Sequence, residues 1–343
     1  MPENNGIRRI TIDATGDAFP HGRDDCVLRS ALRAGVGFPY ECNSGGCGSC
    51  RFTLVSGDVE VLWEEAPGRS ARDRRKNIYL GCQTRALGDI AIDVRLRQNV
   101  DEAHLPAKRR GRLVGLKDLT HDIREFQIEV EGPPGFLPGQ YAIFEFDGGA
   151  VRRCYSMSNL PNERGIWDFQ IKRVADGFGT NLLFSLQEGA ELSLDGPYGL
   201  AYVRPEAPRD VLCVAGGSGL SPMISIARAL GSDPAQSDKR IHFFYGCRTV
   251  EDIAGRDYLE DLPGFGERIT YRPVISLPEH EKSRTWNGAT GFIHEEVDRV
   301  LGEDVQNLEI YFAGPPPMAQ AVQELLMLKH QVPFDQIHFD RFF

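Results

Sequence analysis

The chain has 343 residues, enough for two or three domains that each bury a core. Its formal net charge of −10 argues against nucleic-acid binding, because a phosphate backbone is bound by a basic surface. The apolar runs are far shorter than the roughly 20 residues that cross a bilayer, and residues 1–10 (MPENNGIRRI) lack the apolar stretch of a signal peptide. We therefore expect a cytoplasmic protein without a nucleic-acid or membrane partner, whose cysteines are thiols or metal ligands.

The first part of the chain is predicted to mix strands with one helix. Residues 7–13 (IRRITID) alternate apolar and polar side chains like a half-buried strand. Asp24 or Asp25 is expected to cap a helix through residues 26–35 (CVLRSALRAG). A strand at residues 89–96 (DIAIDVRL) closes this unit. The polar, proline-containing stretch that follows is typical of a linker.

A loop rich in cysteine and glycine, YECNSGGCGSCRF, interrupts this unit at residues 40–52. The spacing C-x4-C-x2-C, with one further cysteine 32 residues later, matches the plant-type [2Fe–2S] ferredoxin pattern. Glycines leave room for the bridging sulfides and free backbone N–H groups to point at the cluster. Structural zinc is the alternative, but it usually requires two paired knuckles. The predicted cluster ligands are Cys42, Cys47, Cys50 and Cys82. The other cysteines are expected in the core: Cys26, Cys154, Cys213 and Cys247.

Short β-like stretches separated by glycine and proline dominate residues 111–205, which predicts a small antiparallel barrel. Two motifs stand out there. Residues 152–159 (RRCYSMSN) place arginine, tyrosine and serine in close succession, and residues 172–183 (KRVADGFGTNLL) begin a helix after a glycine turn. Backbone N–H groups and the helix dipole at such a start suit a pyrophosphate. An ordinary glycine turn with a threonine cap is the alternative.

From about residue 208 strands alternate with helices, which predicts a parallel sheet covered by helices. The expected pairs are DVLCVAGG before SPMISIARAL, IHFFYGC before GRDYLEDL, and LEIYFAGP before PMAQAVQELLMLK. The turn at residues 216–219 lacks the third glycine of the usual Rossmann fingerprint. The fold class is therefore multidomain, α+β followed by α/β.

The motif RRCYSMSN resembles the R-x-Y-S motif of the ferredoxin–NADP reductase superfamily. The resemblance implies that Arg153 contacts the flavin phosphate, that Tyr155 packs on the isoalloxazine, and that Ser156 bonds near flavin N5. VLCVAGGSGLSPM and YFAGPPPM resemble the nicotinamide-side motifs of the same superfamily. One departure is Ala313, where most members have cysteine. The predicted cofactor-binding residues are Arg153, Tyr155, Ser156, Lys172, Gly177, Gly179, Thr180, Gly216, Gly217, Gly219, Arg248, Asp252, Gly314, Pro315 and Phe343, and the predicted catalytic residues are Tyr155, Ser156 and Phe343.

The whole chain resembles the reductase component of bacterial multicomponent oxygenases, especially toluene monooxygenase and carbazole-type dioxygenase reductases, in stretches such as FPYECNSGGCGSC, LWEEAPG and IHFDRFF. The resemblance implies a β-grasp ferredoxin domain, a β-barrel FAD domain and an α/β NAD domain. It implies hydride transfer from NADH to FAD, then single electrons to the cluster and on to a ferredoxin or a diiron or Rieske oxygenase. A flavin suits this task because it links a two-electron donor to a one-electron acceptor. We expect a monomer. The expected boundaries are 1–96, a linker at 97–110, 111–207 and 208–343.

Two other classes of function stay open at this point. One is the flavin subunit of another NADH:acceptor oxidoreductase, and the other is a redox sensor that binds nucleotide without turnover. The basic run RSARDRRKN (69–77) is either a docking face for an acidic partner or a solvated helix surface.

The cofactor is expected to be NADH rather than NADPH, because a 2′-phosphate needs cationic partners near the adenosine ribose. The strand at 272–276 runs into LPEHEK, and the preceding strand is followed by Glu251 and Asp252. Two cations count against this expectation, because they are available to bind a 2′-phosphate: Arg248 and Lys282.

The chain end is expected to take part in nicotinamide binding. Phe339, Phe342 and Phe343 lie in the last five residues. In the superfamily a C-terminal aromatic ring commonly stacks over the flavin and moves aside for nicotinamide. The alternative is that these rings only anchor the terminus.

Overall fold

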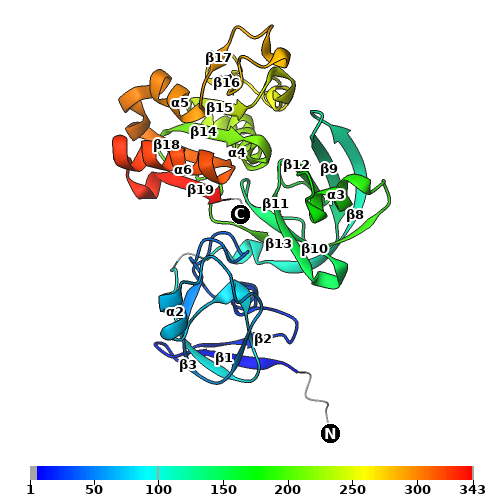
Figure 1. Cartoon of the computed structure of the whole chain (residues 1–343), viewed down its shortest axis with the longest axis vertical. Helices are drawn as coiled ribbons and strands as arrows, with labels where there is room; N and C mark the ends of the chain where they lie inside the picture. Colours follow the sequence, from blue (N-terminus) through cyan, green and yellow to red (C-terminus); the bar gives the residue numbers. More distant parts are fainter. Residues whose placement is uncertain (1–5, 99, 342–343) are drawn as a thin grey trace. The chain divides into compact units, whose positions relative to one another are not determined.

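The computed structural model describes residues 6–98 and 100–341. These residues divide into two compact units that meet in sequence at Ala107 and Lys108 (Figure 1), and each unit is described by itself. Among the described residues, none of the helices has the length and apolar character needed to cross a membrane.

The first unit is a twisted mixed sheet packed against one helix, the arrangement of a β-grasp ferredoxin domain. Its strand order is β2-β1-β7-β3-β5, with β1 parallel to β7 and antiparallel to β2. A separate ribbon joins β4 to β6. The strands are β1 (Arg8–Ile12), β2 (Ala18–His21), β3 (Arg51–Ser56), β4 (Val59–Val61), β5 (Ile78–Leu80), β6 (Thr84–Ala86) and β7 (Ile90–Asp93), and the helices are α1 (Val27–Arg33) and α2 (Ala71–Arg75).

The start of α1 differs from the prediction that Asp24 or Asp25 caps it. The N-cap residue is Cys26, whose sulfur accepts a hydrogen bond from Arg29 N at 3.5 Å. Asp25 instead accepts from the backbone N–H of Cys26 and pairs with arginine side chains of the helix. The reason is burial: Asp25 is 8% exposed beside these guanidinium groups, which compensate its charge better than backbone N–H groups alone.

The second unit begins with a six-stranded barrel. Its strand order is β11-β10-β13-β8-β9-β12, and a bridge between Met157 and Phe169 joins the two edges. Aromatic rings fill the interior, with Phe144 and Phe169 packed edge to face at 4.9 Å. The strands are β8 (Ala107–Asp118), β9 (Ile123–Val130), β10 (Tyr141–Phe146), β11 (Val151–Ser156), β12 (Ile166–Lys172) and β13 (Glu191–Tyr198), with one helix, α3 (Phe178–Ser185). β8 thus begins within the stretch 97–110 that was expected to be a linker.

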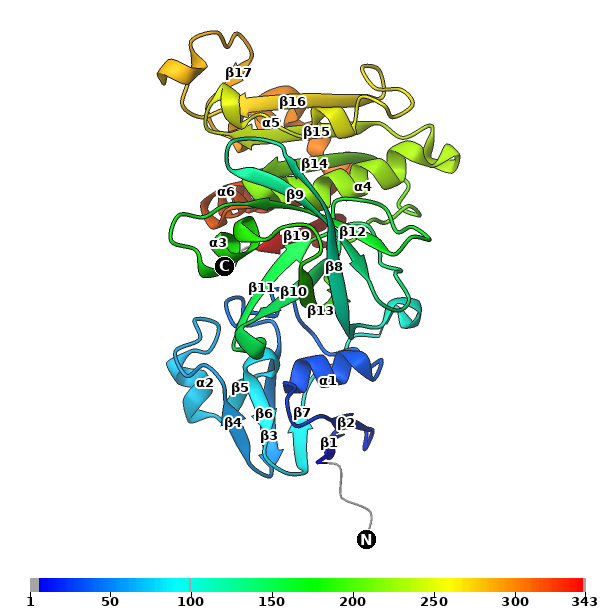
Figure 2. The same cartoon turned by 90° about the vertical axis from the view of Figure 1, so that its right-hand side faces the viewer.

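A six-stranded parallel sheet completes the second unit. Its order is β17-β16-β15-β14-β18-β19, and every pairing is parallel. One hydrophobic cluster lies under α4, and another on the opposite face under α5 and α6. α4 also lies beside β12 of the barrel (Figure 2). The elements are β14 (Asp210–Gly216), α4 (Leu220–Ser232), β15 (Ile241–Cys247), β16 (Ile269–Ile275), β17 (Ala289–Thr290), α5 (Ile293–Leu301), β18 (Leu308–Gly314), α6 (Pro316–Glu324) and β19 (Ile337–Arg341).

One predicted helix was wrong, and another was missed. GRDYLEDL contains only a 3-10 turn at Arg256–Tyr258, because Gly255 has a left-handed backbone (φ +95°) and Pro263 follows closely. Leu259 of this stretch still packs into the cluster under α4. The helix that was missed is α5, with the sequence IHEEVDRVL, and it covers the opposite face of the sheet.

The prediction that four cysteines lie in the core holds for Cys26 and Cys213, which are fully buried. Cys154 and Cys247 are only partly buried. Cys154 lies on β11, an edge strand in the barrel's strand order, and Cys247 is the last residue of β15, so neither is covered on all sides.

Candidate redox centre and nucleotide sites

The four cysteines predicted to bind the cluster come together in the first unit. Cys50 Sγ lies 3.4 Å from Cys82 Sγ. Cys42 Sγ accepts hydrogen bonds from the backbone N–H groups of Ser44 and Cys47, both at 3.4 Å. Hydrogen bonding from the Cys47 side chain lowers the pKa of Cys42. Four sulfurs that come together, of which Cys42 and Cys47 accept backbone N–H groups, fit the donor set of a [2Fe–2S] cluster.

The cluster loop, residues 42–50, is held in shape by contacts that the sequence analysis missed. Arg51 donates to the carbonyl oxygens of Gly48 and Gly68, at 2.7 and 2.6 Å, and pairs with Asp73 at 3.2 Å. Gly68 N donates to Gly45 O at 2.9 Å, and a Cβ at Gly68 would lie 2.7 Å from the same oxygen. The loop and the segment before α2 are therefore packed together through their backbones. An arginine directly after the third cysteine was the available signal.

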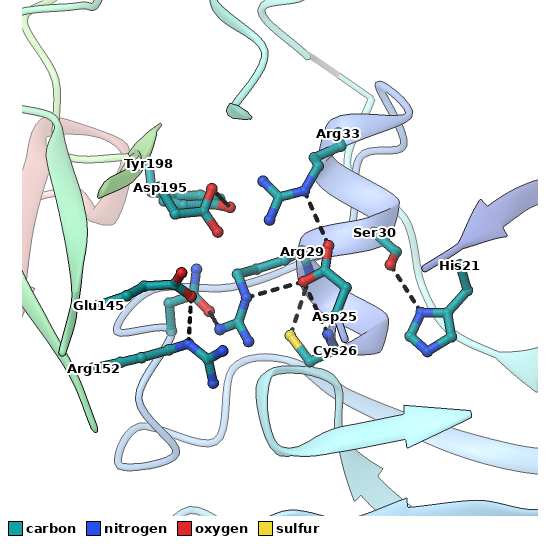
Figure 3. A network of polar contacts seen from close by, with 11 residues as sticks. His21, Asp25, Cys26, Arg29, Ser30, Arg33, Glu145, Arg152, Asp195 and Tyr198 are labelled. Atoms are coloured by element: carbon teal, nitrogen blue, oxygen red, sulfur yellow. Dashed lines mark hydrogen bonds and ion pairs between the residues drawn. The ribbon is translucent and has the colours of Figure 1, made fainter. Parts of the chain in front are cut away.

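A buried charge network fixes α1 beside the loop. Figure 3 shows Asp25 between Arg29 and Arg33, with ion-pair distances of 3.2 and 3.0 Å. Burial opposes ionisation of Asp25, but these two guanidinium groups outweigh it and lower the pKa of the carboxyl group. Arg29 also donates to Asn43 Oδ1 in the loop at 3.4 Å. This network connects the helix to the residue that follows Cys42.

The predicted flavin residues converge on one end of the barrel. Arg153 and Tyr155 lie on β11, and Gly179 lies in the first turn of α3. A Cβ at Gly179 would lie 3.0 Å from Arg153 Cγ and 3.4 Å from Tyr155 Oη, so the helix approaches the strand closely. Gly177 is the N-cap of α3, and Thr180 Oγ1 accepts from Val174 N at 3.2 Å.

A polar atom in this region fits a flavin. The hydroxyl group of Ser156 is buried and has no hydrogen-bond partner within residues 6–98 and 100–341. A buried polar group of this kind normally has a partner, and the polar edge of an isoalloxazine would supply one. Tyr155 packs edge to face on Phe144 at 5.0 Å, and burial raises the pKa of its phenol, which stays neutral.

The glycine turn, residues 216–219, lies at the carboxyl end of β14, where β15 and β18 flank it on either side. This is the topological switch point at which open α/β sheets bind ligands. A Cβ at Gly219 would lie 1.9 Å from Ala313 O, and a Cβ at Gly216 would lie 3.4 Å from Pro315 Cδ. The two predicted nicotinamide motifs, including Gly314, therefore form one surface.

Lys172 lies at the end of β12, beside the glycine turn. A Cβ at Gly217 would lie 3.6 Å from Lys172 Cδ. The ammonium group pairs with Asp122 at 2.8 Å, and this pairing lowers the pKa of Asp122 despite the opposing effect of burial. The sequence analysis did not find Asp122.

The two predicted residues after β15 have different environments. Arg248 is exposed, and its carbonyl accepts from Leu277 N at 2.9 Å, which joins the ends of β15 and β16. Asp252 is buried and caps its own turn, accepting from Thr249 N and Thr249 Oγ1 at 2.8 and 2.9 Å. Its second oxygen faces His121 at 3.8 Å. Phe343 lies outside the described residues.

The helix that follows the glycine turn bonds to the flavin segment. Ser221, in the first turn of α4, donates to Ser156 O at 2.6 Å. The flavin residues and the nucleotide residues of the second unit are therefore neighbours.

Three family models match successive parts of the chain. Residues 10–87 match the 2Fe-2S iron-sulfur cluster binding domain, residues 110–202 match the oxidoreductase FAD-binding domain, and residues 213–324 match the oxidoreductase NAD-binding domain. The chain thus carries a ferredoxin domain, a flavin domain and a nicotinamide domain in this order, as predicted.

Relatives along the whole chain define the class more closely. A ferredoxin–NAD(P)+ reductase, CarAd, of Metapseudomonas resinovorans is 42% identical, over 94% of this chain and 96% of its own. The ferredoxin–NAD+ reductase component of an alkene monooxygenase system from Xanthobacter autotrophicus is 37% identical, over 95% and 98%. The structure of a ferredoxin reductase in carbazole 1,9a-dioxygenase superposes with a TM-score of 0.88 at 38% identity, covering 98% of both chains.

These comparisons confirm the predicted class: the protein is an oxidoreductase with iron–sulfur, FAD and NAD domains. It belongs to the family of ferredoxin–NAD(P)+ reductase components of multicomponent oxygenases.

Proposed function

We propose that this chain takes electrons from NADH and delivers them singly to a separate redox protein of an oxygenase system. The observation that supports the route within the second unit is the hydrogen bond from Ser221 to Ser156 O, because it joins the nucleotide turn to the flavin segment. A bound flavin would accept the hydride and release single electrons to the iron–sulfur cluster. Anaerobic mixing with NADH, followed by optical and electron paramagnetic resonance spectroscopy, tests this proposal. Bleaching of both cofactors supports it, and nucleotide binding without reduction would identify a sensor.

The chain's own residues have three tasks in this proposal. Cys42, Cys47, Cys50 and Cys82 hold the cluster. Arg153, Gly177, Gly179 and Thr180 bind the flavin phosphates, while Tyr155 packs on the ring and Ser156 donates to its polar edge near N5. Lys172, Gly216, Gly217, Gly219, Arg248, Gly314 and Pro315 receive the nicotinamide nucleotide. Asp252 shapes the turn beside Arg248, because its carboxylate is already engaged by Thr249.

A preference for NADH over NADPH is part of the proposal. Lys282, one of the two cations near the expected ribose site, is held by Glu251 at 2.5 Å on the surface. Replacing Glu251 by glutamine releases this cation for a 2′-phosphate. Exposed ion pairs are weak, so we expect the ratio of kcat/KM for NADPH to that for NADH to rise by no more than about fivefold. Steady-state kinetics with both nucleotides measure this.

A matched control is Glu260→Gln, which breaks an exposed pair with Arg256 at 3.1 Å in the same half of the unit. This variant is expected to keep the parent's ratio. Equal kcat/KM values for the two nucleotides in the parent protein would contradict the preference itself.

We also propose that Phe343 covers the flavin ring until nicotinamide takes its place. Offset aromatic stacking contributes roughly 0.5–1.5 kcal/mol beyond area burial. Deleting Phe342 and Phe343 is therefore expected to lower the dissociation constant for NAD+ by up to about tenfold. Titration calorimetry and the flavin spectrum check this, with the iron–sulfur spectrum as the internal control. A truncated chain with the parent's flavin spectrum and NAD+ affinity would leave these rings as an anchor only.

For the partner, we propose a separate ferredoxin or a terminal oxygenase of the diiron or Rieske type, with the chain acting as a monomer. The names of the two relatives as ferredoxin reductases support the first of these. We propose a cytoplasmic location, because an iron–sulfur cluster is held by cysteine thiolates, and cysteines stay reduced in that compartment. The domain boundaries that we propose are 1–96, 111–207 and 208–343, with 97–110 between the first two.

A further inference from the structure

Two buried serines on α4 face the flavin segment, which we define as residues 156–159. Ser221 and Ser225 are four residues apart, so they lie on the same side of the helix. They are 2% and 0% exposed. Hydroxyl groups this deeply buried require protein partners.

Both serines find these partners in the flavin segment. Ser221 Oγ donates to Ser156 O at 2.6 Å and accepts from Gln170 N at 3.3 Å. Ser225 Oγ donates to Asn159 O at 2.7 Å. The helix is therefore joined to both ends of the flavin segment. Two such bonds restrain the angle between α4 and the segment as well as the distance between them.

The segment is itself held against β12. Ser158 N donates to Asp168 O at 2.8 Å, and Asp168 N donates to Asn159 Oδ1 at 3.0 Å. The carbonyl groups that receive the serine hydroxyls thus belong to a rigid part of the barrel, and water does not replace a lost bond at sites this buried.

We propose that Ser221 and Ser225 are positioning residues that set the distance and angle between the flavin segment and the glycine turn. α4 begins directly after Gly219, so the helix transmits their position to the turn. Hydride transfer requires the reacting atoms to lie about 3–3.5 Å apart, and a shift of about 1 Å can slow a reaction about 10²-fold. This inference rests on the proposed function of the second unit.

The test compares Ser221→Ala, Ser225→Ala and the double variant with the parent holoenzyme. The matched control is Tyr258→Phe. It removes another hydrogen bond between the two halves of the unit, from Tyr258 Oη to Glu125 Oε2 at 2.7 Å. The same oxygen also accepts from the Gln170 side chain at 3.3 Å, a bond that does not involve the Gln170 backbone N–H. Stopped-flow reduction by saturating NADH gives the rate of flavin reduction, and the long-wavelength absorbance of nicotinamide stacked on flavin reports their geometry. Ser221 Oγ accepts a hydrogen bond from the backbone N–H of Gln170. Hydrogen exchange at this N–H therefore reports the loss of that bond, independently of the enzymatic rate.

Each serine variant is expected to slow flavin reduction at saturating NADH by about tenfold or more and to weaken the stacking absorbance, while KM changes little. Exchange at Gln170 should accelerate in Ser221→Ala and not in Tyr258→Phe, which should keep the parent's rate. If Ser221→Ala exposes the Gln170 amide but leaves rate and absorbance unchanged, the inference is wrong. It is also wrong if Tyr258→Phe slows reduction equally. A parent protein that NADH does not reduce would instead overturn the proposed function.

Discussion

Replacing Cys82 with serine is expected to remove the iron–sulfur cluster and to leave the flavin in place. Cys82 is 1% exposed and its Sγ lies 3.4 Å from Cys50 Sγ, so the substitution takes away one of the four sulfurs that come together there. Mutating a residue that only hydrogen-bonds to a metal ligand typically lowers metal affinity about 10–100-fold. Losing a ligand itself should lower the affinity at least as much. Reduction of cytochrome c by NADH should therefore fall at least about tenfold, while reduction of ferricyanide persists, because it draws on the flavin.

Iron and labile sulfide analysis, with flavin absorbance alongside, measures this outcome. Cys26→Ser is the matched control, because it makes the same chemical change at another fully buried cysteine of the same unit. Serine is also a good N-cap for α1, so this variant should keep its cluster. A Cys82 variant with the parent's iron and sulfide content would show that the ligand assignment is wrong.

Substituting alanine for Gly219 is expected to disable the nucleotide site. The added Cβ would lie 1.9 Å from Ala313 O and 2.4 Å from Ala313 C, both backbone atoms, so the glycine turn has to move. Overpacking of this kind typically costs about 1–3 kcal/mol of stability, and displacing the turn should reduce NADH-driven flavin reduction by at least about tenfold. Dithionite should still reduce the flavin, because it does not use the nucleotide site.

The comparison variant is Gly88→Ala, since an added Cβ there meets nothing within 4 Å and the backbone is not left-handed. Thermal unfolding, NAD+ affinity and the rate of flavin reduction should all match the parent in this control. Parental NAD+ affinity and reduction rate in Gly219→Ala would mean that the turn does not form the nucleotide site.

The sequence predicted those parts of the molecule that local pattern dictates. The spacing of Cys42, Cys47 and Cys50 and the alternation of strands with helices after residue 208 need no tertiary information, and the comparisons confirm the cluster domain and the fold. The helix predicted over GRDYLEDL does not form, because its helix-forming residues lie between Gly255 and Pro263. These two helix-breaking residues outweigh the helix propensity of the residues between them. Arg51, Asp122 and Ser225 were missed because their roles depend on partners that are 17 to 66 residues away in sequence.

The contacts of Arg51 bear on how the cluster is assembled. The guanidinium group donates to one carbonyl oxygen of the cluster loop, Gly48 O, and to one of the segment before α2, Gly68 O, without involving iron or the cysteine sulfurs. Part of the conformational entropy that four mobile ligands would lose on metal binding is therefore lost already when the polypeptide folds. In zinc fingers the metal has to drive the folding of its own site. Here contacts within the polypeptide itself fix the shape of the loop, so less ordering of the thiolates remains for the step in which the cluster binds.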